Sequence, residues 1–331
     1  MEVNIETLKQ NPERGKIRYI FPGDNDQGYA KMISALANIE GGNLLLGISD
    51  DGKKLHTKGY TFSVPKKEKL VELLDGFDNF SIEEILYDNK HFVNISVNKE
   101  SDGIKFEGNY YMFSSSFNNT TVPIQPVKLF ISYNHKVSEL TDIIEEELTK
   151  KFGPKVHINR DTSLKYRDSI EDFMVSIKQN DLVVSLISNS YMKSEACMYE
   201  ITELMKDDNF KEKLAYIVLS QKDAKLFSKE IDSSDLVPNV YGGARFGYVE
   251  YWTLKKNEYD SQMERLKDNH AATVELNQVV KRMAIISQGV GPFVEHLNSS
   301  KGLDFTSMQE DDFSEVHSLI EKTFEQLNRK Q

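Results

Sequence analysis

The apolar run Leu182–Ile187 constrains the fold of this chain more than any other stretch. It is short, rich in β-branched residues, and it ends in the polar sequence Ser188-Asn189-Ser190. These features are typical of a parallel-sheet strand that is buried on both faces. A helical pattern follows as far as residue 204, and Ser194 offers a hydroxyl where its first turn would begin. The sequence therefore predicts a strand that runs almost directly into a helix.

Glu200 lies one to two turns into this predicted helix. Open α/β sheets bind ligands in the crevice outside the carboxyl ends of their strands, which is where this helix would start. A carboxylate delivered there is well placed for chemistry, although most glutamates on helices are simply solvated. Position alone therefore makes Glu200 a candidate, and its surroundings have to decide its role.

Strand and helix patterns alternate on both sides of this unit. Such alternation indicates a parallel, doubly wound sheet flanked by helices. An irregular excursion is expected over Gln221–Gly247, which contains Pro238 and a glycine pair. Further strands are predicted at Val127–Tyr133, Lys155–Asn159 and Leu214–Leu219, and helices after Val137, over Asp168–Gln179, as one long pattern over Leu254–Ser287, and over Asp312–Asn328.

The first 126 residues have a different character. Gln27–Glu40 shows helical spacing, Gly41-Gly42 ends the helix, and Asn43–Ile48 is typical of a buried strand. The glycine pair is interpreted either as the helix cap or as a place where backbone amides approach a phosphate. Asp50-Asp51-Gly52 indicates a turn. A compact α+β module follows, with a second helix over Lys66–Asp75 and strands near Ile82–Tyr87, Phe92–Val97 and Tyr110–Ser114.

Composition limits the class of protein. The chain has 331 residues, of which 39% are hydrophobic, enough for two ordinary domains. A net charge of -11 argues against a sequence-independent grip on nucleic acid. A single cysteine fits a reducing compartment, and neither a signal peptide nor an apolar run of transmembrane length is present in the sequence. We therefore expect a soluble cytoplasmic protein without a membrane partner.

Pro123 and Pro126 suit an extended connection between domains. We therefore expect a first domain at residues 1–121, a linker at 122–126, and a second domain at 127–331 that includes the C-terminal helices.

Three stretches in the second half carry a family resemblance. They are Leu129–Tyr133, then Arg160-Asp161 with the loop 164–170, then Ile187–Tyr191 followed at fixed spacing by residues up to Glu200. Together and in this order they resemble the signatures of a TIR (Toll/interleukin-1 receptor) domain. The resemblance implies a flavodoxin-like fold with a central parallel sheet.

The resemblance also implies a reaction. In enzymatic TIR domains, a glutamate at the position matched by Glu200 stands beside a pocket for nicotinamide adenine dinucleotide (NAD+). Nicotinamide leaves a pyridinium as a neutral molecule, so the main demand is to stabilise a ribosyl cation, which a fixed carboxylate can do. Attack by water gives ADP-ribose, and attack by adenine gives a cyclic product. The expected activity is that of an NAD+ nucleosidase, with NAD+ as substrate, no cofactor and no metal.

Further residues are expected to bind the substrate, each with an alternative role. Ser132 and Tyr133 end a strand at the crevice, where turn-forming polar groups are equally common. Arg160 could meet the diphosphate, or form a surface ion pair. Trp252 could stack on a base, or belong to the core. The complete set of expected substrate-binding residues is Ser132, Tyr133, Arg160, Asp161, Cys197 and Trp252.

Two departures from the TIR pattern concern the same region. Ala196 stands where a tryptophan is common, so an aromatic stack on that side has to come from elsewhere. Tyr166 and Arg167 replace the usual proline and glycine of a loop that neighbouring TIR domains use to pack together. The assembly geometry is therefore expected to differ.

The first half has a resemblance of its own. Ser34–Lys53 and the segment Gly108–Ser116 are similar to the AlbA-like domain of Schlafen proteins. Arg18–Phe21 replaces the Glu-Phe-Lys-like strand of that family, and the sequence shows no acidic cluster suited to a nuclease metal. We therefore expect a sensing or assembly role for this domain.

Taken together, the resemblances imply an NAD+-cleaving protein of antiviral defence and innate immunity that is held in check until a trigger orders its chains. Homo-oligomerisation through both domains and a phage-derived or nucleic-acid trigger are expected. The alternatives are a catalytically inactive TIR scaffold for protein–protein signalling and, as a weaker one, a nucleic-acid-binding regulator.

Overall fold

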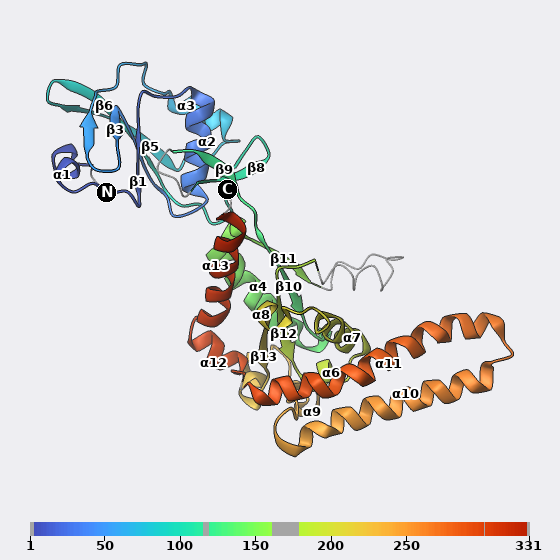
Figure 1. The fold of residues 1–331 in the computed structure, drawn as a ribbon. Coiled ribbons are helices and arrows are strands. Elements are labelled where there is room, and N and C mark those ends of the chain that lie inside the picture. Colours follow the sequence, from blue (N-terminus) through green and yellow to red (C-terminus); the bar gives the residue numbers. More distant parts are fainter. Residues whose placement is uncertain (1–2, 115–118, 161–178, 301, 330–331) are drawn as a thin grey trace. The chain divides into compact units, whose positions relative to one another are not determined.

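The computed structural model describes residues 3–114, 119–160, 179–300 and 302–329 (Figure 1). The chain forms two compact units, each with its own sheet. The first unit comprises Met1–Pro126, Leu148–Val156 and Phe324–Gln331, and the second comprises Val127–Glu147 and His157–Thr323.

The first unit is built on a mixed four-stranded sheet. Its strands are ordered β1 (Ile17–Ile20), β2 (Gly42–Leu46), β6 (Lys90–Val97) and β5 (Phe80–Tyr87). β1 and β2 are parallel, whereas β6 is antiparallel to both of its neighbours. The strands predicted at the positions of β2, β5 and β6 are confirmed.

Helix α2 (Asp26–Ala37) covers one face of this sheet. Asn25 caps its first turn by accepting a hydrogen bond from the amide of Gly28. At the other end Gly41, with φ +73°, donates its N–H to the carbonyl of Leu36 at 2.9 Å. A Cβ at Gly41 would also lie 2.6 Å from the Val97 carbonyl oxygen. The amide of Gly41 therefore serves the helix cap, the first of its two interpreted roles.

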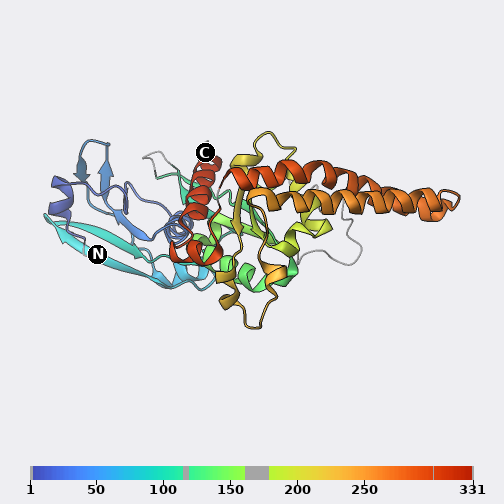
Figure 2. The ribbon, with the colours of Figure 1, turned by 90° about the horizontal axis from the view of Figure 1, so that it is seen from below.

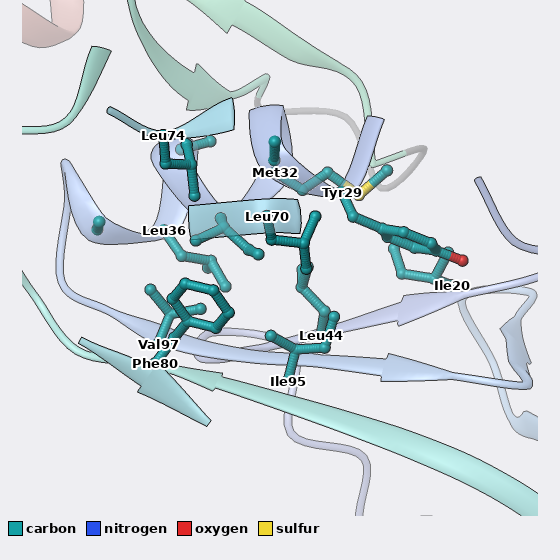
Figure 3. Packing of buried hydrophobic residues seen from close by; sticks show 14 of the residues in the cluster. Ile20, Tyr29, Met32, Leu36, Leu44, Leu70, Leu74, Phe80, Ile95 and Val97 are labelled. Carbon is teal, nitrogen blue, oxygen red and sulfur yellow. The ribbon is translucent and has the colours of Figure 1, made fainter. Parts of the chain in front are cut away.

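The sheet carries a hydrophobic cluster on each face, because successive side chains of a strand point to opposite sides. Leu44 and Ile95 pack toward α2 and α3 (Lys67–Leu73), as Figure 3 shows. Leu45 belongs to the other cluster, with residues of α1 (Ile5–Gln10).

Short hairpins complete the first unit. The predicted turn at Asp50–Gly52 is confirmed: it joins the antiparallel strands β3 (Ile48–Asp50) and β4 (Leu55–Thr57). Part of the segment predicted as a linker is instead paired in a small sheet. That sheet consists of β7 (Lys105–Phe106), β8 (Asn109–Phe113) and β9 (Thr121–Pro123).

The second unit contains the expected parallel sheet, which confirms the flavodoxin-like fold class. Its order is β11 (Val156–Arg160), β10 (Val127–Ser132), β12 (Leu182–Ile187) and β13 (Leu214–Val218). β12 pairs in parallel with β10 and with β13. All residues of β12 are buried, as its continuous apolar sequence predicts.

Helices flank this sheet (Figure 1). The segments predicted as a helix over Asp168–Gln179 and as the loop 164–170, with Tyr166 and Arg167, lie outside the described residues, apart from Gln179. The described α-helices that follow β10 are α4 (Ser138–Phe152), α6 (Asn189–Met192), α7 (Glu195–Leu204), α8 (Phe210–Lys213), α9 (Ser233–Leu236), α10 (Phe246–Leu266), α11 (His270–Ser299), α12 (Phe305–Glu310) and α13 (Ser314–Asn328). The last residues of α4 and of α13 belong to the first unit.

Four 3₁₀ turns are described beside these helices: η1 (His135–Val137), η2 (Gly153–Lys155), η4 (Gln221–Leu226) and η5 (Gly242–Arg245).

The prediction of a single long helix over Leu254–Ser287 is wrong. The segment folds into the antiparallel pair α10 and α11, which project together from the unit (Figures 1 and 2). The break falls at Lys267–Asn269, where the Asn269 amide donates to the Leu266 carbonyl at 2.8 Å. Asp268 and Asn269 favour turns through their side chains, but their signal is weak beside the helical spacing around them. Among the described helices, none is both long and apolar enough to cross a bilayer.

Helix α11 packs closely on α7, the helix that carries Glu200. The two helices share a core cluster that includes Ile286 and Ile201. Their approach is closest at Gly289, where a Cβ would lie 2.3 Å from Cγ2 of Thr202. Glycine at this position therefore sets the spacing between the helices.

We predict that Gly289→Ala lowers the free energy of unfolding by about 1–3 kcal/mol, because the added methyl overpacks the α7–α11 contact. Gly247→Ala is the matched control in α10, where no atom lies within 4 Å of a built Cβ. It should be neutral or stabilising by up to about 1 kcal/mol, through helix propensity. Urea denaturation followed by circular dichroism measures both, and equal effects of the two variants would contradict the close packing.

Candidate functional site

Two successive helix starts shape the carboxyl end of the second sheet. Ser188 follows β12 and caps α6, its hydroxyl accepting from the amide of Tyr191 at 2.9 Å. Ser194 then caps α7 by accepting from the amide of Cys197 at 3.4 Å. Because α7 begins at this cap, as predicted, Glu200 projects from its second turn toward the end of β10.

Glu200 is buried, with 5% of its surface exposed. Its Oε2 accepts a hydrogen bond from the Ser132 hydroxyl at 2.8 Å. Ser132 is the last residue of β10 and lies 3.0 Å, Oγ to Oη, from Tyr191. A serine hydroxyl has one proton, so Ser132 accepts from Tyr191 while it donates to Glu200. The three groups form a directed chain of hydrogen bonds that ends on the carboxylate.

The Tyr191 phenol is suited to remain a donor in this chain. Burial raises its pKa above the ordinary value, and the nearby Cys197 and Glu200 groups raise it further. The phenol therefore keeps its proton at neutral pH. The sequence placed Tyr191 inside a family signature but gave no sign that its hydroxyl reaches the site.

Tyr133 and Cys197 hold the end of β10 against α7. The Cys197 thiol donates to the backbone carbonyl of Tyr133 at 3.4 Å, and both residues are buried. The Tyr133 ring meets His135 edge to face, with centroids 5.8 Å apart. Both predicted residues therefore lie close to Ser132 and Glu200, where they brace the backbone.

Arg160 ends β11 and is paired with carboxylates of α4. Its guanidinium lies 2.5 Å from Oδ1 of Asp142 and 3.0 Å from Oε2 of Glu145. The hydrogen bond with Asp142 raises the pKa of Arg160. This arrangement matches the ion-pair alternative for Arg160. Asp161 lies outside the described residues.

Trp252 lies in the core of the second unit, with 0% of its surface exposed. Its indole Nε1 donates to the Met192 carbonyl at 2.9 Å, and its ring meets Tyr251 edge to face. No face of the ring is open to a ligand in this arrangement. Trp252 therefore takes the core role, because the α10–α11 pair brings it against α6.

An open pocket of about 400 Å³ lies at the same end of the sheet. Lys136 in this pocket is held by Asp235, with Nζ 2.7 Å from Oδ2, and Ser190 donates to the same carboxylate at 2.9 Å. The Lys136 ammonium lowers the pKa of Asp235. The described residues lining the pocket are Asn134, Lys136, Asn189, Ser190, Lys193, Ser194, Ser234 and Asp235.

Sequence reasoning missed most of this lining. Asn134 and Ser194 adjoin recognised signatures, but Ser234 and Asp235 come from the segment predicted as an irregular excursion. Among the described residues, Glu200 does not line the pocket, and no group of three His, Cys, Asp or Glu side chains is arranged to hold a metal ion. The groups that this region could present to a ligand are a fixed carboxylate, hydroxyl and amide groups, and lysine ammonium groups.

Comparison with known families identifies one domain in each half of the chain. Residues 129–266 match the family model for the TIR domain, and residues 8–125 match that for Schlafen, AlbA_2. The chain therefore contains an N-terminal Schlafen AlbA_2 domain followed by a TIR domain, as both resemblances predicted.

Solved structures share this chain's features only distantly. The DIP2311 protein from Corynebacterium diphtheriae is 12% identical with a TM-score of 0.30, over 53% of this chain and 37% of that protein. The TIR domains of the activated Roq1 resistosome, which directly recognizes the pathogen effector XopQ, are 14% identical with a TM-score of 0.30, over 61% of this chain and 99% of theirs. The chain thus spans little more than a third of DIP2311. No curated protein matches it.

We predict that Ser132→Ala lowers the free energy of unfolding by about 1–3 kcal/mol, because the buried Glu200 and Tyr191 each lose a hydrogen-bond partner. Ser190→Ala is the control: its hydroxyl is less buried and bonds to the partly exposed Asp235, so the change should stay within about 0.5 kcal/mol. Urea denaturation compares the two. Equal stability of Ser132→Ala and wild type would contradict the hydrogen-bond chain.

Proposed function

We propose that this protein is an NAD+ nucleosidase that cleaves the bond between nicotinamide and ribose, with Glu200 as the catalytic carboxylate. The observation that carries the proposal is the buried Glu200 carboxylate, whose Oε2 is held by the Ser132 hydroxyl at 2.8 Å. A carboxylate kept in one orientation, at the carboxyl end of a parallel sheet in a TIR domain, is placed for ligand chemistry.

The reaction needs one ionised carboxylate and no general acid. The bond from the anomeric carbon to the pyridinium nitrogen breaks, its electron pair leaves with neutral nicotinamide, and the ribose becomes cationic. Glu200 stabilises this cation at short range, and its burial strengthens the attraction because water screens it less. Water then adds to the cation and loses a proton to give ADP-ribose; attack by the adenine base gives a cyclic product.

The neighbouring pocket supplies a place for the rest of the dinucleotide. Its volume of about 400 Å³ falls in the range of small-molecule sites. Lys193 places positive charge in its lining, where Asp235 balances the charge of Lys136, and this favours a diphosphate. Asn134 and Ser190 offer hydrogen bonds to ribose or amide groups. NAD+ is the substrate in this proposal, and no separate cofactor or metal takes part.

The burial of Glu200 makes an activation step necessary in this proposal. A carboxylate with 5% of its surface exposed has to be uncovered before a ribose can reach it. In our proposal, homo-oligomerisation through the TIR and Schlafen AlbA_2 domains does this, in response to a phage-derived or nucleic-acid trigger in the cytoplasm. Antiviral defence is the proposed setting, because an NAD+-consuming enzyme that was always active would harm its own cell.

The test is nicotinamide release from NAD+ by wild type, Glu200→Gln and Glu203→Gln, measured in dilute and concentrated protein and with oligomerising additives. Glu203→Gln removes the same charge from the same helix, where Glu203 pairs with Lys206. Glu200→Gln should reduce release by at least about a hundred-fold, as the loss of a group that stabilises transition-state charge does. Glu203→Gln should retain wild-type release.

A scaffold without catalysis is the second candidate, and the near-complete burial of Glu200 favours it. Background-level release by all three proteins under every condition would favour that candidate over the enzymatic one. Salt-sensitive mobility shifts with DNA or RNA would instead support a nucleic-acid-binding regulator.

A further inference from the structure

Arg18 lies on β1 of the Schlafen AlbA_2 domain and is half-buried. Its guanidinium carbon lies 4.5 Å from the centroid of the Phe113 ring, which holds the side chain in place by a cation–π contact. Its Nε is buried and has no hydrogen-bond partner among the described residues. In the described parts of the chain, no carboxylate lies within ion-pair distance of this guanidinium.

A neighbouring arginine shows the contrast. Arg14 makes a bidentate pair with Asp50, with nitrogen–oxygen distances of 2.7 and 2.9 Å. Arg18 has no such partner in the part of the chain that the structure describes, and burial lowers its pKa. An arginine nevertheless stays charged in proteins. Removing a cation from water without a counter-charge is costly, so Arg18 is a cationic group that an anion would stabilise.

Arg18 lines an open pocket of about 430 Å³. Every lining residue belongs to the first compact unit. Leu36, Ile39 and Met112 give the pocket apolar walls, and Lys16 adds a second cation. Two acidic residues are also present: Glu40, and Glu325, which pairs with Arg329 at 2.7 Å.

We propose that this pocket binds an organic phosphate of mononucleotide size, a phosphomonoester that carries a flat base. The planar guanidinium of Arg18 matches the geometry of phosphate oxygens, and Lys16 adds charge. The base packs on the apolar walls, where the flexible side chain of Met112 adapts to its shape. The volume suits a small ligand. The ligand is a free mononucleotide or the phosphorylated end of a nucleic-acid strand, and the site is independent of Glu200 and of NAD+ cleavage.

The experiment is isothermal titration of the full chain with adenosine monophosphate, for wild type, Arg18→Met, Arg18→Lys and Arg265→Met. Arg18→Met keeps an unbranched apolar stem but removes the guanidinium and its charge, so it should weaken binding by at least about ten-fold. Arg18→Lys keeps the charge but lacks the planar guanidinium that can bond to two phosphate oxygens, and it should bind with intermediate affinity. Arg265, exposed on α10, provides the charge-matched control, and Arg265→Met should bind as wild type does.

Thermal unfolding separates ligand binding from a structural role. Without ligand, Arg18→Met should be about as stable as wild type, because loss of the cation–π contact with Phe113 is offset by removal of a charge that has no ion-pair partner among the described residues. A purely structural arginine would leave the variant less stable. A 5′-phosphorylated oligonucleotide and its unphosphorylated form distinguish a strand end from a free mononucleotide as the ligand: binding only of the phosphorylated strand, lost in Arg18→Met, supports a strand end.

Failure of wild type to bind either probe at millimolar concentration, or equal binding by Arg18→Met, would overturn the proposal.

Discussion

The hydrogen bond between Ser132 and Glu200 joins a strand end to a helix turn, and much of the second unit serves to bring these two residues together. Parallel pairing of β10 with β12 sets Ser132 opposite Ser185. Two serine caps then turn the chain from β12 into α7 within a few residues. Gly289 allows α11 to pack directly on that helix. The two caps are local preferences, whereas the strand pairing and the α7–α11 contact join distant residues; together they fix one carboxylate.

Burial of Glu200 strengthens its interaction with a nearby cation and also limits access to it. A carboxylate away from water interacts strongly with a nearby cation, and a hydrogen bond from Ser132 keeps it oriented. The same burial limits access by a substrate. In the described chain, the carboxylate that we propose as the reacting group is oriented but covered. The proposed regulation by assembly would uncover Glu200 rather than build a new site.

Local signals in the sequence predicted the elements that position this site. The Leu182–Ile187 strand and the Ser194 cap depend on residues that are close in sequence, so the position of Glu200 on α7 could be predicted. Roles that depend on distant partners could not. The core position of Trp252 depends on how the α10–α11 pair folds back, and that turn has only a weak local signal. The absence of a carboxylate near Arg18, among the described residues, is likewise a property of tertiary packing.

The most direct measurement is a structure of the Glu200→Gln protein, assembled at high concentration, with intact NAD+ bound. The account predicts that the nicotinamide ribose lies against residue 200, with its hydroxyls within hydrogen-bonding distance of the side-chain amide and its diphosphate toward Lys136 and Lys193. A dinucleotide bound elsewhere, with residue 200 still covered and bonded to Ser132, would contradict the central claim that this carboxylate acts on the ribose.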